Sequence, residues 1–66
     1  MQKFGECLRL QRKERGFTQE KMAERLSIHR TTYLRYESGE AQPPLETLCR
    51  LADILECTAD ILLGRG

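Results

Sequence analysis

The sequence predicts an all-α fold, a compact bundle of five short helices that includes a helix-turn-helix. Apolar residues recur at helical intervals between clear stop signals, which are Gly16, Ser27, Ser38-Gly39, Pro43-Pro44 and Gly64. No segment alternates apolar and polar residues as a strand would. A chain of 66 residues can bury one modest core, so residues 1–66 are expected to form a single domain.

The first two helices are expected over about residues 4–14 and 18–26. One face of the first carries Phe4, Cys7, Leu8 and Gln11, with Leu10 at its edge. Gly16 suits the left-handed position after a helix, and the Thr18 hydroxyl can cap the next one. In the second helix Met22, Ala23 and Leu26 face inward, while the outward side carries Glu20, Lys21, Glu24 and Arg25. Residues four apart on that side have like charges, so burial must stabilise the helix.

The third helix is expected from His29, as its N-cap, to Glu37 or Ser38, with Gly39 as the stop. Tyr33 and Tyr36 lie within about 60° of each other on a helical wheel and predict the core face. The far side carries Thr31, Leu34 and Arg35, and Arg30 projects from the first turn.

The last two helices follow the diproline and Thr58. Proline is tolerated in a first turn, and the predicted inner face of the fourth helix is Leu45, Leu48, Cys49, Ala52 and Leu55. Thr58 is expected to cap a short final helix with Asp60 in its first turn and an apolar end at Ile61, Leu62 and Leu63.

Charge is unevenly distributed although its sum is only +1. Residues 1–36 carry nine Lys or Arg and four Glu, whereas residues 37–66 carry two Arg and six Asp or Glu. This split is compatible with a basic face for a polyanion, or with ordinary solvated helix surfaces. No apolar run could cross a bilayer and the start lacks a secretory signal, so the cytoplasm is expected.

Metal, cofactor and catalytic sites are not expected. Cys7, Cys49, Cys57 and His29 lack the spacing of zinc ligands, and Cys7 and Cys49 are interpreted as small core residues. With one histidine, no acidic pair in a plausible pocket and no phosphate-binding glycine loop, the sequence offers no candidate enzyme site.

The outer side of the third helix has chemistry suited to a DNA major groove. Arginine can donate two hydrogen bonds to guanine, and a threonine methyl can touch a thymine methyl. A plain polar surface helix is the alternative for this segment taken alone. A short helix, a tight turn and a second helix with such a face constitute the helix-turn-helix motif.

A longer stretch carries a specific resemblance, "GFTQEKMAERLSIHRTTYLRYESGEAQPPLETLCRLADILECTADILL". With its Thr18-Gln19, Met22-Ala23, Leu26-Ser27-Ile28, Glu37-Ser38-Gly39 and Leu51-Ala52 elements, it resembles the lambda-repressor-like family of Cro and phage repressors, also called XRE-type. The resemblance covers about residues 4–64. It implies a sequence-specific DNA-binding transcriptional regulator of the repressor type, with helix 29–37 in the major groove.

The resemblance also implies roles for individual residues. Those expected to contact bases are Arg30, Thr31, Leu34 and Arg35. Those expected to contact phosphate or position the helices are Thr18, Gln19, Lys21, His29 and Thr32. Gln19 would also buttress the first residue of the recognition helix, and an ion pair between Arg12 and Glu37 would tie the first helix to the third.

The DNA partner follows from the resemblance, and the dimer follows from the small size of the chain, because one copy buries little DNA surface. A symmetric homodimer on palindromic double-stranded DNA is expected, through Ile61–Leu63 unless those residues pack into the core. Two departures from the family pattern stand out. Ser27 replaces the usual turn glycine, and His29 stands where Ser or Thr is commoner, either as a pH sensor or as a plain helix start. A protein-interaction module, antitoxin-like or an adaptor, is the alternative function on this fold.

Overall fold

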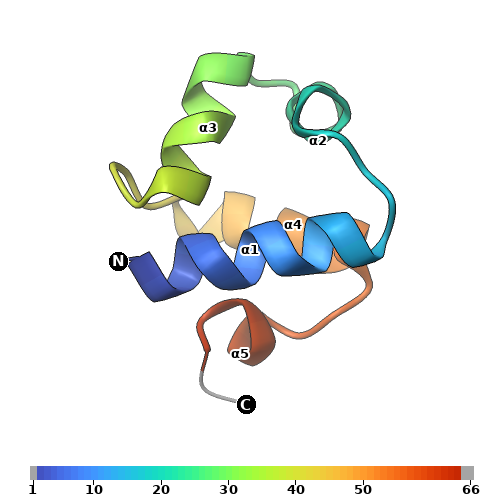
Figure 1. Ribbon diagram of the computed structural model, residues 1–66, viewed down its shortest axis with the longest axis vertical. Helices are drawn as coiled ribbons and strands as arrows, with labels where there is room; N and C mark the ends of the chain where they lie inside the picture. Colours follow the sequence, from blue (N-terminus) through green and yellow to red (C-terminus); the bar gives the residue numbers. More distant parts are fainter. Residues whose placement is uncertain (1, 65–66) are drawn as a thin grey trace.

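The computed structural model describes residues 2–64, and in that range the chain forms five α-helices without a strand. These are α1 (Gln2–Glu14), α2 (Gln19–Leu26), α3 (Arg30–Ser38), α4 (Leu45–Leu55) and α5 (Ala59–Leu62). In Figure 1, α1 runs across the middle of the molecule, with α2 and α3 on one side of it and α5 on the other. The all-α prediction is confirmed.

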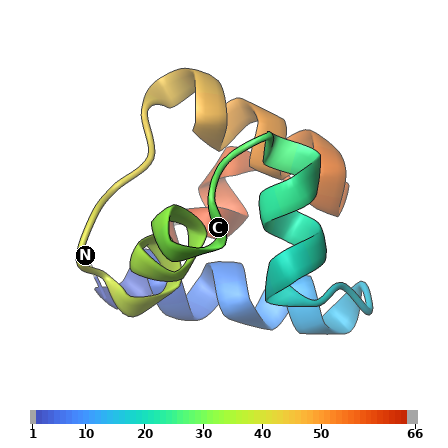
Figure 2. The same cartoon turned by 90° about the horizontal axis from the view of Figure 1, so that it is seen from above.

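One core is shared by all five helices. The largest fully buried side chains are Leu8, Met22, Tyr33, Leu51, Leu55 and Leu62. Phe4, Ala23, Leu26 and Tyr36 complete the buried apolar cluster. Figure 2 shows α1, α2, α3 and α4 arranged around this centre. None of the helices in the described range is both long enough and apolar enough to span a lipid bilayer.

Helix ends agree closely with the stop signals in the sequence. The Thr18 hydroxyl accepts a hydrogen bond from the Lys21 amide at 3.0 Å, and the Thr58 hydroxyl accepts one from the Ile61 amide at 3.2 Å. Gly39 ends α3 with φ of 87°. His29 occupies the N-cap position of α3 without a side-chain cap hydrogen bond. α1 begins at Gln2, earlier than the predicted Phe4, and α4 begins at Leu45 directly after the diproline.

The predicted inner face of α4 is partly wrong. Leu45 is 74% exposed and Cys49 is exposed, whereas Leu51 and Leu55 are completely buried. The apolar residues of α4 form two overlapping stripes at helical spacing, and the sequence does not show which stripe is buried. Leu45 is the first residue of α4 and lies outside the stripe that contains Leu51 and Leu55. Cys49 is therefore a surface thiol and not the core residue expected, and Cys7 is only half-buried.

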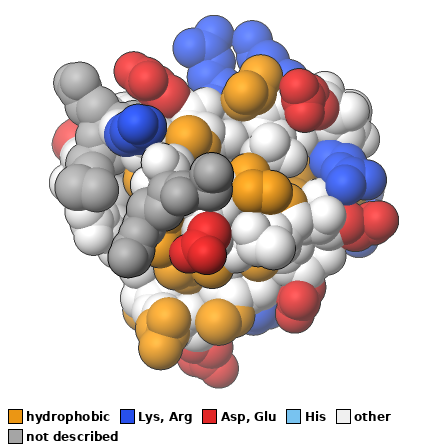
Figure 3. Space-filling view, turned by 90° about the horizontal axis from the view of Figure 1, so that it is seen from below, with side chains coloured by type: hydrophobic (Ala, Val, Ile, Leu, Met, Phe, Trp, Pro, Cys, Tyr) orange, Lys and Arg blue, Asp and Glu red, His pale blue; other side chains and the backbone are white. Residues whose placement is uncertain are grey.

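The apolar end of the chain divides between core and surface. Leu62 is buried without exposed area and Leu63 is partly buried, while Ile61 is 40% exposed. Figure 3 looks onto this side of the molecule, where hydrophobic side chains lie among acidic and basic ones. The core-packing interpretation therefore holds for Leu62, and Ile61 remains available at the surface.

The turn between α2 and α3 forces a serine into the left-handed region. Ser27 has φ of 58° and ψ of 41°, and its amide is directed at the carbonyl groups of Ala23 and Glu24. The Ile28 amide donates to the Ala23 carbonyl at 3.0 Å, which closes the helix end. A residue with a Cβ is strained in this conformation. Serine in place of the usual turn glycine at position 27 therefore lowers the stability of the fold.

Replacing this serine by glycine should stabilise the fold. Ser27→Gly is expected to raise the free energy of unfolding by about 1 kcal/mol, because glycine adopts the left-handed conformation without strain. Glu24→Gly, within α2, is the matched control and should lower it by up to about 1 kcal/mol. Urea unfolding followed by circular dichroism measures both, and a destabilised Ser27→Gly protein would contradict the strain argument.

Candidate nucleic-acid interface

The side of α3 opposite the tyrosines lies at the surface. Tyr33 and Tyr36 are buried in the core, and Arg30, Thr31 and Arg35 are exposed. Of the other predicted contact residues, His29 is exposed and Thr32 and Leu34 are half-buried. α3 thus buries its two tyrosines and presents guanidinium and hydroxyl groups to solvent on the opposite side.

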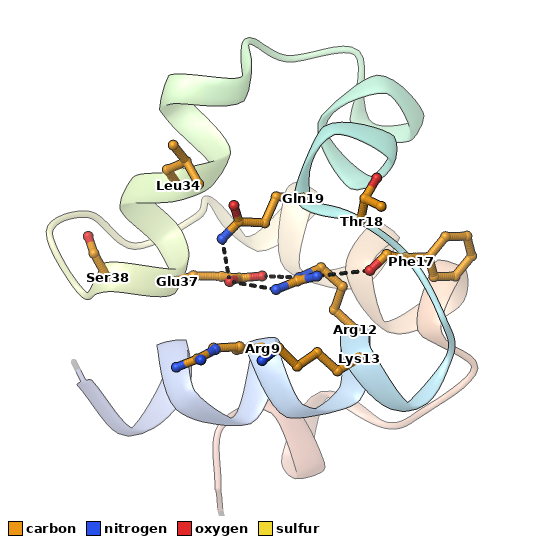
Figure 4. Close-up of a pocket in the computed structure, with 9 residues that line it drawn as sticks. All are labelled: Arg9, Arg12, Lys13, Phe17, Thr18, Gln19, Leu34, Glu37 and Ser38. Atoms are coloured by element: carbon orange, nitrogen blue, oxygen red, sulfur yellow. Dashed lines mark hydrogen bonds and ion pairs between the residues drawn. The ribbon is translucent and has the colours of Figure 1, made fainter.

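The Glu37 carboxylate joins three helices at the base of this surface. Arg12 from α1 donates to Glu37 through Nε at 2.6 Å and through a terminal nitrogen at 3.4 Å. Gln19 at the start of α2 donates its side-chain amide to Glu37 Oε1 at 3.1 Å, and the Tyr33 hydroxyl donates to Oε2. A further Arg12 nitrogen donates to the Phe17 carbonyl at 2.8 Å. Figure 4 shows Glu37 between α1 and the first residues of α2.

Burial makes this network sensitive to charge. The Arg12 and Glu37 side chains are only 8% and 5% exposed. Burial acts to raise the pKa of Glu37, but hydrogen bonds from Arg12, Tyr33 and Gln19 outweigh it and hold that pKa below its ordinary value of 4.5. Burial and the adjacent carboxylate raise the pKa of Tyr33, so its hydroxyl stays protonated and remains a donor.

Gln19 has a different partner from the one expected. A carboxylate only accepts hydrogen bonds, so the Gln19 amide nitrogen must face Glu37, in the last turn of α3. Its oxygen points away from Glu37 in Figure 4. Within residues 2–64, no side-chain hydrogen bond joins Gln19 to Arg30, the first residue of α3. Gln19 therefore braces the carboxyl-terminal end of α3.

Two other predicted phosphate ligands already have partners. The Thr18 hydroxyl caps α2, and the Lys21 ammonium forms an ion pair with Glu24 at 3.0 Å. Lys21 also shares a shallow hollow with Glu20 and Glu24. The surroundings of the Lys21 ammonium are thus less favourable to an anion than the sequence alone indicates.

An open cleft of about 650 Å³ lies between α1, the start of α2 and α3. Its lining consists of Arg9, Arg12, Lys13, Phe17, Thr18, Gln19, Leu34, Glu37 and Ser38. Figure 4 shows Arg9 and Lys13 extending from α1 on one side and Leu34 and Ser38 on α3 on the other. Sequence reasoning missed Lys13, although its position four residues after Arg9 places both cations on one side of a helix.

Metal binding and thiol chemistry find no site near this surface. Within residues 2–64 no three His, Cys, Asp or Glu side chains are grouped so that they could hold a metal ion. Cys7, Cys49 and Cys57 are free thiols outside the cleft lining.

A braced second helix after a tight turn, with an outward polar face, is the geometry of a helix-turn-helix. Residues 8–62 match the family model described as helix-turn-helix. The chain belongs to the helix-turn-helix family. The match includes both helices of the motif and most of the residues that support them.

Two curated helix-turn-helix proteins illustrate the relationship. The chain is 46% identical over 63 residues to the cryptic phage CTXphi transcriptional repressor RstR of Vibrio cholerae, which covers 96% of this chain and 56% of the relative. It is 45% identical over 60 residues to the SPbeta prophage-derived uncharacterized HTH-type transcriptional regulator YonR of Bacillus subtilis, covering 91% and 56%. The chain therefore spans about half the length of these relatives.

Two solved helix-turn-helix structures share the fold over almost the whole chain. The P22 c2 repressor in complex with synthetic operator 9T superposes with a TM-score of 0.88 at 27% identity, covering 100% of both chains. The restriction-modification controller protein C.AhdI from Aeromonas hydrophila gives 0.84 at 30% identity, covering 92% of both.

Removing Arg12 should destabilise the fold strongly. Arg12→Ala is expected to lower the free energy of unfolding by about 3 to 5 kcal/mol, because it leaves the buried Glu37 carboxylate uncompensated. Arg15→Ala is the matched control, since Arg15 pairs with the exposed Glu56 at 3.6 Å and should change stability by less than about 1 kcal/mol. Equal effects of the two substitutions in thermal unfolding would show that Glu37 does not depend on Arg12.

The Tyr33 hydroxyl should matter most when Glu37 is ionised. Tyr33→Phe is expected to lower the free energy of unfolding by about 1.5 to 3 kcal/mol near pH 7. The pKa of Glu37 is depressed in the fold, so its stabilising contribution is complete above the ordinary value of 4.5 and is lost as the pH falls through the lower folded-state value. The difference between wild type and variant should therefore shrink below that range.

Urea titrations across this pH range measure the effect. Tyr36→Phe is the control, because the Tyr36 hydroxyl makes no hydrogen bond within residues 2–64, and its small effect should not vary with pH. A Tyr33→Phe difference that stays constant down to strongly acidic pH would argue against a bond to the ionised carboxylate.

Proposed function

We propose that this chain binds double-stranded DNA sequence-specifically as the DNA-binding part of a transcriptional regulator of the repressor type, acting in the cytoplasm without catalysis. The carrying observation is the exposed side of α3, where Arg30, Thr31 and Arg35 project from a helix held by the Glu37 network. The P22 c2 repressor, solved with a synthetic operator, supports this proposal through its similar fold.

In the proposed complex α3 enters the major groove. Arg30 and Arg35 donate to guanine, and Thr31 and Leu34 contact thymine methyl groups. His29 and Thr32 contact the backbone at the first turn of α3, where free amides and the helix dipole attract phosphate. Bases then determine specificity, and phosphate contacts fix the position of the helix.

The proposal includes a homodimer on a palindromic operator. A single α3 reaches only a few base pairs, and two copies would read half-sites about one helical turn apart. The exposed Ile61 on α5 gives such a dimer an apolar contact, while the buried Leu62 is not available for it.

Selection of bound duplexes from a randomised pool tests this function. Inverted half-sites that contain guanine are expected, and Arg35→Ala should weaken binding of the selected duplex by about 1 to 3 kcal/mol while scarcely affecting a scrambled one. Arg50→Ala, which removes an exposed arginine on α4, is the control and should leave base preference unchanged. If wild type enriches no sequence and binds no duplex, the protein-interaction alternative would replace this proposal.

A further inference from the structure

Two cationic side chains of α1 lie outside the recognition helix, α3, but line a cleft that reaches it. Arg9 and Lys13 are exposed, stand four residues apart and line the cleft that reaches Leu34 and Ser38 of α3. The ion pairs within residues 2–64 use other cations, namely Arg12, Arg15 and Lys21. Glu6 shares a neighbouring hollow with both cations, but it forms no ion pair with either of them within residues 2–64. Both side chains are therefore not held by a carboxylate, as Lys21 is, and can turn to an outside anion.

The interior of the cleft does not cancel this charge. Glu37 is the only acidic residue in its lining, and the carboxylate already accepts from Arg12, Gln19 and Tyr33. With Arg12 and Glu37 neutralising each other, the remaining charges of the lining are positive. The cleft also adjoins the first turn of α2, whose positive dipole end favours anions.

The shape of the cleft favours an extended polyanion over a small enclosed ligand. It opens broadly to solvent and has α3 as one wall, so a strand whose bases meet α3 would bring its backbone along α1. Four helical residues advance about 6 Å, so Arg9 and Lys13 reach different points along such a strand.

Lys21 differs from Arg9 and Lys13 because acidic side chains surround it. It projects from α2, but Glu24 holds its ammonium at 3.0 Å and Glu20 lies in the same hollow, so acidic groups outnumber it locally. An approaching phosphate would have to displace this pair.

We propose that Arg9 and Lys13 bind two backbone phosphates of the DNA strand that crosses the cleft, and that Lys21 takes no part. This inference rests on the proposed function, which it extends from α3 to α1. These contacts contribute affinity without base preference, because phosphate carries no sequence information.

The test is a salt titration of duplex binding. The double variant Arg9→Gln with Lys13→Gln should weaken binding of the selected and the scrambled duplex by similar factors. Each lost phosphate contact should reduce the slope of log K against log salt by about 0.9, hence by about 1.8 for both. The advantage of wild type should then shrink about tenfold between roughly 50 and 200 mM salt.

Three comparisons make the outcome decisive. Lys21→Gln should keep the wild-type slope, and the charge-preserving Arg9→Lys with Lys13→Arg should also keep it. Circular dichroism should show unchanged unfolding for these surface variants. An unchanged slope in the double glutamine variant, or an equal fall in Lys21→Gln, would overturn the inference while leaving the DNA-binding function intact; failure of wild type to bind any duplex would instead overturn the function.

Discussion

The buried carboxylate of Glu37 is the contact on which the arrangement of the first three helices depends. Helices of eight and nine residues, such as α2 and α3, are too short to be stable alone, so tertiary contacts must set their orientation. Arg12 and Gln19 converge on Glu37 from α1 and α2, and Tyr33 adds a bond from within α3. A buried ion pair contributes little net stability compared with apolar packing, but losing one partner is expensive. We infer that its value here is geometric, because the helices must keep this arrangement for Arg12, Gln19 and Tyr33 to donate to one carboxylate.

This geometry fixes which side of α3 faces solvent. Tyr33 has its ring in the core and its hydroxyl on Glu37, so α3 cannot rotate about its axis without losing both packing and a hydrogen bond. A slip of one residue would turn the helix by about 100° and would put a charged side chain, either Arg35 or Glu37, in the buried place of Tyr36. Arg30 and Arg35 are thereby held outward before any ligand arrives. Such preorganisation lowers the entropy lost on binding, which is important for a surface as small as one short helix.

Local signals made most of the fold predictable, and long-range contacts account for what was missed. Thr18, Gly39 and Thr58 mark helix ends because caps depend on neighbouring amides and on backbone conformation. The exposure of Leu45 was not predictable, since helical periodicity cannot choose between overlapping stripes without knowing the neighbouring helix. At the candidate site, the outward side of α3 followed from the tyrosine stripe. The pairing of Arg12 with Glu37, 25 residues away, was expected mainly from family resemblance, and the hydrogen bond from Gln19 to Glu37 was not expected.

The distribution of ion pairs explains how a chain of net charge +1 could still attract a polyanion. Several acidic side chains are already matched: Glu37 within the protein, Glu24 with Lys21 and Glu56 with Arg15. Within residues 2–64, the cations of the α3 surface, and Arg9 and Lys13 of the cleft, do not belong to these pairs. At physiological ionic strength, charges more than about 8 Å away are largely screened, so an approaching phosphate responds mainly to the charges near it. The charge that matters for DNA is therefore local, and the total is a poor guide to it.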